Sequence, residues 1–391
     1  MNFIKREIKA ETIGIIDIGS YKIRAGICNF KNGDLELIGY GEKRQDTRYI
    51  KSGEVTNIEG LCKNIESALK KAEKGLKIKV KKIIINISFK EVFIKTNKLN
   101  YKRKDIYKEI DKEELDTIIK KVEKKIISEH LSDIKNDSGY NKSDLKLILS
   151  NITKIQIDKI DTKKLLGQNG ENISLSILNT FIPLSQYNLL EYIEEYLNKK
   201  IIKILPSEYA ITKLFKKKNN IVIIDVGNYH TSIIIKKEGQ IIGVSKIPIG
   251  IGNLVKNIRK NNDVSKINII NSMDENIYAD EKIDFLEIFE ECLIAGLEKI
   301  LGNNICPHNF FVSGGGSNIF VKNYIKQIKF QKRGIKIIKE VNFVEPKIKY
   351  LENILSSSNL NIISMIITTL DFIKKGKDPI SESLRKLIKK I

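Results

Sequence analysis

Apolar residues in the first ninety positions form strand-like runs interrupted by one helical stripe. The runs at residues 12–30 and 35–40 predict a hairpin and a third strand. A helix with one apolar face follows, with Asn57 as its N-cap and Gly75 as its C-cap. The apolar run at 80–87 then predicts a buried strand. Three strands, a crossover helix and a parallel strand are typical of the start of a mixed α/β sheet.

The pattern changes between residues 90 and 170, which are polar and rich in lysine. They predict one long helix at 113–130 and strands at 145–149 and 153–160. An alternation of strand, helix and strand resumes between residues 174 and 205. We therefore interpret residues 90–170 as a small inserted subdomain.

The second half of the chain repeats the order of the first, which suggests a duplicated fold with a cleft between the copies. A hairpin begins at Asn220, a third strand is predicted at 240–247, and Pro248 with two glycines breaks the chain before a helix. Residues 261–283 are weakly patterned. The remaining predicted elements are a helix at 284–301, a strand at 335–338 and a helix at 361–372.

A short motif marks the two hairpins. Ile-Ile-Asp-Ile-Gly-Ser at residues 15–20 returns as Ile-Ile-Asp-Val-Gly-Asn at 223–228, each time between two strand-like runs. A third glycine cluster at 312–317, Val-Ser-Gly-Gly-Gly-Ser, follows an apolar run and precedes a helical pattern. Each piece alone is most often a plain turn or loop. The ordered set predicts a nucleotide phosphate tail held between two domains.

The chemistry of these residues suits that ligand. Glycine lets backbone N–H groups approach phosphate oxygens, Ser20 adds a hydroxyl and Lys22 adds a positive charge. Asp17 and Asp225 are placed to hold a hydrated Mg²⁺ through water. A glycine turn that opens a helix is a place for a phosphate or a nucleoside. The predicted nucleotide-binding residues are Asp17, Gly19, Ser20, Lys22, Asp225, Gly227, Asn228, Gly314, Gly315, Gly316 and Ser317.

Composition limits the class of protein. A chain of 391 residues exceeds one core and suggests two or more domains. The net charge is +21, but lysines are spread along a chain generally rich in Lys, Ile and Asn, so we do not expect nucleic acid as a partner. No apolar window spans a bilayer and no signal peptide is evident, so we expect a cytosolic chain. The four scattered cysteines argue for reduced thiols rather than disulfides or zinc.

The last eleven residues predict a basic amphipathic helix. Apolar residues in 381–391 recur at i, i+3, i+4 and i+7, with Lys and Arg on the other face, after a polar linker at 374–380. Such a helix lies on an anionic membrane surface; the alternative is a terminal helix packed on the protein body. The predicted membrane-binding residues are Leu384, Arg385, Lys386, Leu387, Ile388, Lys389, Lys390 and Ile391.

Together, the two hairpins at Asp17 and Asp225 and the loop at 313–317 resemble the actin-like ATPase superfamily. Within it the chain is most similar to the FtsA family. This resemblance rests on three features, which are the insertion, residues 52–57 and the C-terminal helix. The resemblance implies duplicated actin-like (ribonuclease H-like) α/β domains around a nucleotide cleft, with an FtsA-type inserted subdomain. It also implies ATP and Mg²⁺ as cofactors, and a cell-division role in which the protein tethers FtsZ filaments to the membrane.

The same resemblance sets further expectations. The protein would attach peripherally to the cytoplasmic side of the cell membrane at the division site, self-associate into filaments and meet other divisome proteins. The implied boundaries are 1–89 and 171–217 for the first actin-like domain, 90–170 for the insertion, 218–373 for the second domain, 374–380 for the linker and 381–391 for the membrane helix.

The second hairpin departs from the family pattern. Asn228 and Tyr229 stand where the family has glycines, and the later carboxylate is absent, so we expect ATP turnover to be slow or absent. This departure resembles the PilM family of type IV pilus assembly proteins, which shares the insertion. The C-terminal helix is the reason for preferring FtsA. A sugar-kinase-type enzyme is the third interpretation, and the lysine-rich insertion disfavours it.

Overall fold

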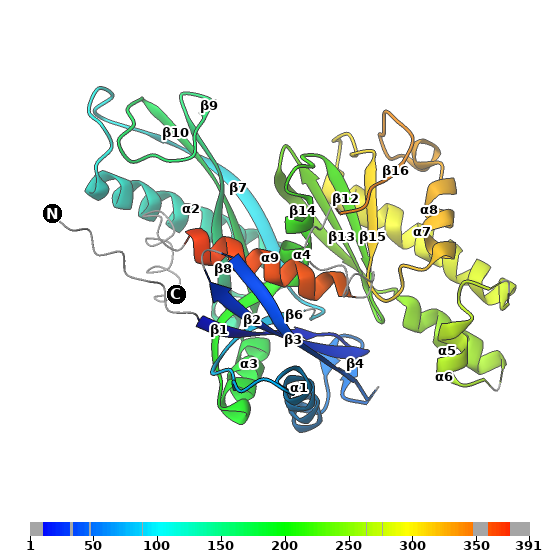
Figure 1. Cartoon of the computed structure of the whole chain (residues 1–391). Coiled ribbons are helices and arrows are strands. Elements are labelled where there is room, and N and C mark those ends of the chain that lie inside the picture. Colours follow the sequence, from blue (N-terminus) through cyan, green and yellow to red (C-terminus); the bar gives the residue numbers. More distant parts are fainter. Residues whose placement is uncertain are drawn as a thin grey trace. The chain divides into compact units, whose positions relative to one another are not determined.

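The structure, a computed structural model (Figure 1), contains two compact units. The larger comprises residues up to Lys90, Glu194–Gly239 and Gly243–Leu370; the smaller comprises Glu91–Ile193 with two short segments from later in the chain. The predicted membrane helix at 381–391 lies outside the described residues, as does the predicted linker beyond Lys375. The described residues are 11–31, 34–46, 48–87, 89–262, 264–275, 277–346 and 359–375.

The larger unit begins with a five-stranded sheet in the order β11-β6-β1-β2-β3. The first three strands are antiparallel, and β6 and β11 run parallel to β1, so the predicted hairpin, third strand and crossover are confirmed. The strands are β1 (Glu11–Ile18), β2 (Lys22–Lys31), β3 (Asp34–Arg44), β6 (Lys82–Ile87) and β11 (Lys200–Pro206), with a small β4 (Ile50–Lys51) and β5 (Glu54–Val55) pair before the crossover.

The crossover helix α1 (Ile58–Ala72) starts where the sequence predicts. The side chain of Asn57 caps it by accepting from the Gly60 N–H at 2.8 Å. The helix ends with Glu73 as its C-cap, earlier than the Gly75 expected, and Gly75 takes a positive φ in the following turn. One apolar face of α1 therefore packs on the sheet as its periodicity requires.

Two glycines of β3 allow α1 to approach the sheet. A Cβ at Gly41 would lie 2.4 Å from the carbonyl oxygen of Ala68, and one at Gly39 would lie 2.1 Å from that of Ala72. On the opposite face, a Cβ at Gly26 would lie 3.3 Å from Ile362 of α9 (Leu360–Lys375). The sheet is therefore covered on one face by α1 and on the other by α9 (Figure 1).

We expect Gly41→Ala to destabilise the protein by about 1–3 kcal/mol, because the new methyl group meets helix backbone that moves only if α1 shifts. Chemical denaturation followed by circular dichroism measures this. Gly315→Ala is the control, since a Cβ there meets nothing within 4 Å. Equal stability of the two variants would contradict the close packing of α1 on β3.

The second half of the larger unit repeats the first. Its sheet has the order β14-β13-β12-β15-β16, again with an antiparallel hairpin, a third strand and a parallel strand. The predicted strand at 335–338 is wrong: Ile337 makes only an isolated bridge to Cys306. The strands are β12 (Ile221–Val226), β13 (Thr231–Lys237), β14 (Gln240–Ile247), β15 (Asn309–Ser313) and β16 (Asn342–Phe343).

Helices pack on this second sheet around one apolar core. Val222, Ile224 and Val226 of β12 share that core with Phe289, Leu293 and Leu297 of the long helix α7. The weakly patterned stretch before α7 contains the short helix α6. The helices of this half are α5 (Ile251–Asn261), α6 (Lys266–Asn271), α7 (Ala279–Leu301) and α8 (Ile319–Gln327), and α4 (Ser207–Ile211) follows β11.

The smaller unit is an antiparallel sheet with one long helix. The sheet order is β7-β10-β8-β9, and α2 (Lys112–Ser138) packs on it through residues such as Ile118, Val122 and Ile126. The helix is longer than predicted, and the two predicted strands are one, β8. The other elements are β7 (Phe93–Lys102), β8 (Leu145–Ile157), β9 (Ile160–Asp161), β10 (Asn172–Pro183) and α3 (Leu184–Leu197), which continues into the larger unit.

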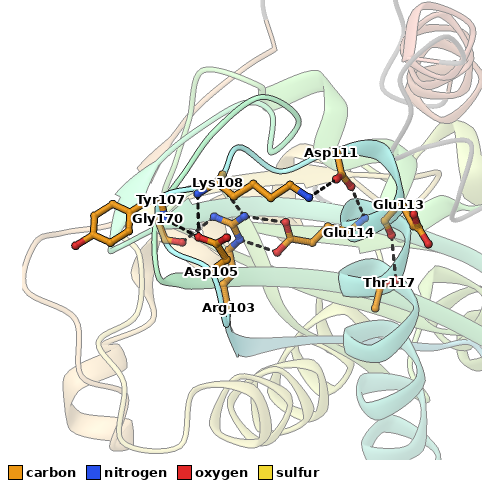
Figure 2. A network of polar contacts seen from close by, with 9 residues as sticks. All are labelled: Arg103, Asp105, Tyr107, Lys108, Asp111, Glu113, Glu114, Thr117 and Gly170. Atoms are coloured by element: carbon orange, nitrogen blue, oxygen red, sulfur yellow. Dashed lines mark hydrogen bonds and ion pairs between the residues drawn. The ribbon is translucent and has the colours of Figure 1, made fainter.

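One buried arginine organises the loop that leads into α2 (Figure 2). Arg103 makes two hydrogen bonds to Glu114, at 2.8 and 2.7 Å, and donates to the carbonyl oxygens of Lys108 and Gly170. Asp105 accepts the N–H groups of Tyr107 and Lys108. The loop is therefore fixed at its base, while the Tyr107 ring points away from the network and is 85% exposed.

None of the helices in the described ranges combines the length and apolar character needed to cross a bilayer.

Candidate nucleotide site

The two hairpin turns have the same tight geometry. A Cβ at Gly19 would lie 2.7 Å from the Lys22 carbonyl oxygen, and a Cβ at Gly227 would lie 2.7 Å from that of His230. In the second turn the Gly227 N–H donates to this same oxygen at 3.0 Å. Both glycines are therefore required by the close approach of backbone within the turn itself. The sequence repeat corresponds to a structural repeat.

The second hairpin and the glycine cluster lie together. β12 pairs in parallel with β15, which places Asp225 beside Ser313, and the Ser313 hydroxyl donates to Asp225 Oδ1 at 2.8 Å. The Gly316 N–H donates to the Val226 carbonyl oxygen at 2.9 Å. The Ser317 hydroxyl closes the loop by donating to the Gly314 carbonyl oxygen at 2.8 Å. The loop is thus built onto the end of β12.

The three glycines of the cluster play different parts. Gly314 has a φ of +92°, and a Cβ there would lie 2.3 Å from the Val226 carbonyl oxygen. A Cβ at Gly316 would lie 2.6 Å from the Val226 side chain. Packing on β12 therefore accounts for these two glycines. Gly315 differs, because a Cβ there meets nothing within 4 Å, so its backbone borders open space.

Asp225 is a titratable group that contacts this loop through Ser313. Burial raises the pKa of its carboxyl to about 6; the hydrogen bond from Ser313 opposes the shift, and the negative charges of Glu208 and Asp17 add to it. A ligand phosphate placed here would meet a carboxyl whose pKa is raised by burial.

Asn228, the predicted binding residue that departs from the family pattern, contacts the start of α5. Its carbonyl oxygen accepts the Gly252 N–H at 2.8 Å, and the Gly227 carbonyl oxygen accepts the Ile251 N–H at 2.9 Å. A Cβ at Gly252 would lie 2.7 Å from Asn228 Oδ1. The hairpin therefore binds the first amides of α5. Gly250 and Gly252, which the sequence marked only as a chain break, have no side chain and so allow this contact.

The first hairpin holds partners that the sequence analysis missed. Asp17 is 1% exposed; its Oδ2 accepts from Arg24 at 3.1 Å and its Oδ1 accepts from Asn86 at 3.0 Å. Lys22, expected to face phosphate, donates to Glu42 at 2.7 Å. Ser20 lies in the turn and is partly exposed. The predicted residues of the first hairpin thus lie close together: Asp17, Gly19, Ser20 and Lys22. The cation that binds Asp17 is Arg24.

The residues present do not fit the Mg²⁺ expected between Asp17 and Asp225. Asp17 already has a guanidinium group and an amide on its two oxygens, and Ser313 donates to Asp225. Within the described part of the chain, no group of three or more His, Cys, Asp or Glu residues is arranged to hold a metal ion. No chemical step is therefore assigned to a metal here.

A second buried charge pair lies beside the second hairpin. Glu208 of α4, 1% exposed, binds Lys246 of β14 at 2.8 Å and accepts from the Ser232 hydroxyl at 3.1 Å. Burial alone would raise the pKa of Glu208, but Lys246 outweighs it and holds that pKa below its ordinary value. Lys246 also donates to the carbonyl oxygen of Phe89. No sequence pattern predicts this pair, because its two members lie in different elements.

The comparisons with known proteins identify the fold. No family model matches the chain, and no curated protein matches it. A chain of a PilM–PilN type IV pilus biogenesis complex superposes with a TM-score of 0.63 at 10% identity, covering 91% of this chain and 97% of that one. MreB 5 of Spiroplasma citri bound to AMPPNP gives a TM-score of 0.47 at 11% identity, with coverage of 94% and 98%. The chain has an actin-like ATPase fold.

Proposed function

We propose that this chain is a nucleotide-binding scaffold protein that uses ATP as a structural ligand. The observation that carries the proposal is the open backbone at Gly315, in a loop that is fixed to β12 and whose Ser313 binds Asp225. The first hairpin supplies a second tight glycine turn at Gly19. With Asn228 and Tyr229 in the place of small residues, turnover is expected to be slow or absent.

Two assemblies are compatible with such a scaffold. The first is an FtsA-like tether that recruits FtsZ to an anionic membrane, self-assembles into filaments and meets other divisome proteins at the cytoplasmic face of the division site. Its support is the sequence resemblance and the basic helix predicted at 381–391. The second is a PilM-like pilus platform, supported by the likeness in fold to the PilM–PilN complex.

Sedimentation with vesicles separates the two assemblies. The tether predicts that FtsZ filaments pellet with anionic vesicles only when this chain is present, and that deleting 381–391 abolishes the effect. A platform would instead bind a PilN-type protein and leave FtsZ in the supernatant. The latter result would exclude the tether.

We expect Gly315→Val to weaken ATP binding at least about tenfold while changing the unfolding free energy by less than about 0.5 kcal/mol, because the new side chain enters only the open space. Calorimetric titration and chemical denaturation measure the two quantities. Gly139→Asn, at the end of α2 in the smaller unit, is the matched control at another open glycine. Unchanged ATP affinity in Gly315→Val would show that the nucleotide does not bind at this loop.

A further inference from the structure

We propose that Arg24 takes the place of the divalent cation at the first hairpin, so that nucleotide binding by this chain does not require Mg²⁺. The inference rests on the proposed nucleotide-binding function and deepens it. It concerns the positive charge beside Asp17, which is a fixed guanidinium group rather than an exchangeable metal ion.

Strand register places Arg24 in a row of polar residues that crosses the sheet. Asp17 of β1 is opposite Arg24 of β2, Arg24 is opposite Glu42 of β3, and Asp17 is beside Asn86 of β6. Residues paired in register point to the same face of a sheet. From β6 to β3 the row therefore reads amide, acid, base, acid, and each of its carboxylates accepts from a cationic side chain.

Burial and hydrogen bonds fix Arg24 in this row. The Arg24 side chain is 11% exposed and that of Asp17 is 2% exposed. Arg24 Nη1 donates to Asp17, and its Nε donates to Asn359, which precedes α9, at 3.0 Å. Guanidinium stays protonated in proteins, so the positive charge on Asp17 is permanent. Moving it would leave a buried carboxylate without its counter-charge.

A metal ion at this carboxylate competes with that arrangement. Mg²⁺ requires a nearly octahedral oxygen shell and releases its waters reluctantly. Both Asp17 oxygens already accept hydrogen bonds, and a cation there would stand beside a guanidinium group. Guanidinium has five N–H donors in a planar fork that suits phosphate oxygens, and the contacts described above use two of them. Arg24 can therefore supply charge and hydrogen bonds together.

The test is a titration of the full-length protein with ATP, in EDTA and in excess Mg²⁺. We expect the two dissociation constants to agree within about threefold. Arg24→Gln keeps amide donors near Asp17 but removes the charge. Its affinity in EDTA should fall at least about tenfold and recover in part with Mg²⁺, because Asp17 is then free of a fixed cation. Arg24→Lys keeps the charge and should still bind in EDTA.

Arg333→Gln is the matched control. It removes a guanidinium group that is ion-paired with Glu290 and Glu291 of α7, outside both hairpins, so it should create no dependence on Mg²⁺. Wild-type binding that requires Mg²⁺ would overturn this inference and leave the proposed function standing. Absence of ATP binding by folded protein in both buffers would overturn the proposed function itself. If Arg24→Gln fails to fold, the wild-type and Arg24→Lys titrations in EDTA still decide the question.

Discussion

Replacing Glu123 with glutamine should stabilise the smaller unit by about 3 kcal/mol near pH 8 and by less than about 1 kcal/mol near pH 5. Glu123 lies on the sheet-facing side of α2, is 2% exposed, and neither of its carboxylate oxygens has a hydrogen-bond partner within the described residues. Burial raises the pKa of this carboxyl from 4.5 to about 7, and the nearby Ser150 hydroxyl opposes the shift only partly.

The sign follows from the two states. In the unfolded chain the carboxyl ionises above about pH 4.5, whereas in the folded protein it stays protonated until about pH 7. Stability is therefore lost as the pH rises through this window, and the loss is complete above the folded pKa. Glutamine resembles the protonated acid and cannot ionise, so the variant avoids the loss.

Urea denaturation followed by circular dichroism at several pH values measures the difference. Glu113→Gln, at an exposed position in the first turn of the same helix, is the matched control and should leave the pH dependence of the parent chain unchanged. His130, further along α2, provides an internal reference at acid pH. Burial lowers its pKa from 6.5 to about 4. This histidine therefore destabilises the folded protein as the pH falls from about 6.5 to about 4. A gain in Glu123→Gln that is equal at all pH values would show a packing effect instead.

Local patterns made much of the fold predictable from the sequence. The hairpins, the third strands and α1 follow from apolar periodicity, glycine turns and the Asn57 cap, all of which act within a few residues. The last eight residues of α2, 131–138, were missed because polar residues such as Asp133 and Asn136 dominate them and Ile134 is the one buried apolar position there. β16 was missed because two residues carry no periodicity.

The candidate site was less accessible to sequence reasoning. Asp225 and the glycine cluster were predicted together, and β12–β15 pairing confirms that they are neighbours. Arg24 could have been found, since a hairpin that turns at Gly19 places residue 24 opposite Asp17. Asn86 could not, because its position depends on β6 lying beside β1, which no local pattern specifies. Lys22, chosen as the nearest cation, binds Glu42 instead.

Lys246→Met should destabilise the larger unit by about 3–5 kcal/mol, the largest effect we expect from one substitution outside the apolar core. The change removes the cation from Glu208 and leaves its buried carboxylate with neutral donors such as the Ser232 hydroxyl. Glu208→Gln should also be costly, since Lys246 would keep only its bond to the Phe89 carbonyl oxygen among these contacts. The double variant, Glu208→Gln with Lys246→Met, should recover most of the loss, because no buried charge then lacks its partner.

The pH dependence distinguishes a charge pair from simple packing. In the parent chain Lys246 holds the pKa of Glu208 low, so the pair contributes stability above the ordinary carboxyl pKa and loses it in acid. In Lys246→Met the effect of burial, which raises that pKa, is no longer offset by the cation, so stability should increase as the pH falls towards 5. Denaturation of the single and double variants at about pH 5 and pH 8 measures both the coupling and its sign. Additive losses, with the same dependence of stability on pH in every variant, would show that Glu208 and Lys246 are not coupled. Because Lys246 also binds the Phe89 carbonyl oxygen after β6, a strong coupling would mean that an ion pair, independent of nucleotide, fastens the second half of the duplicated fold to the first.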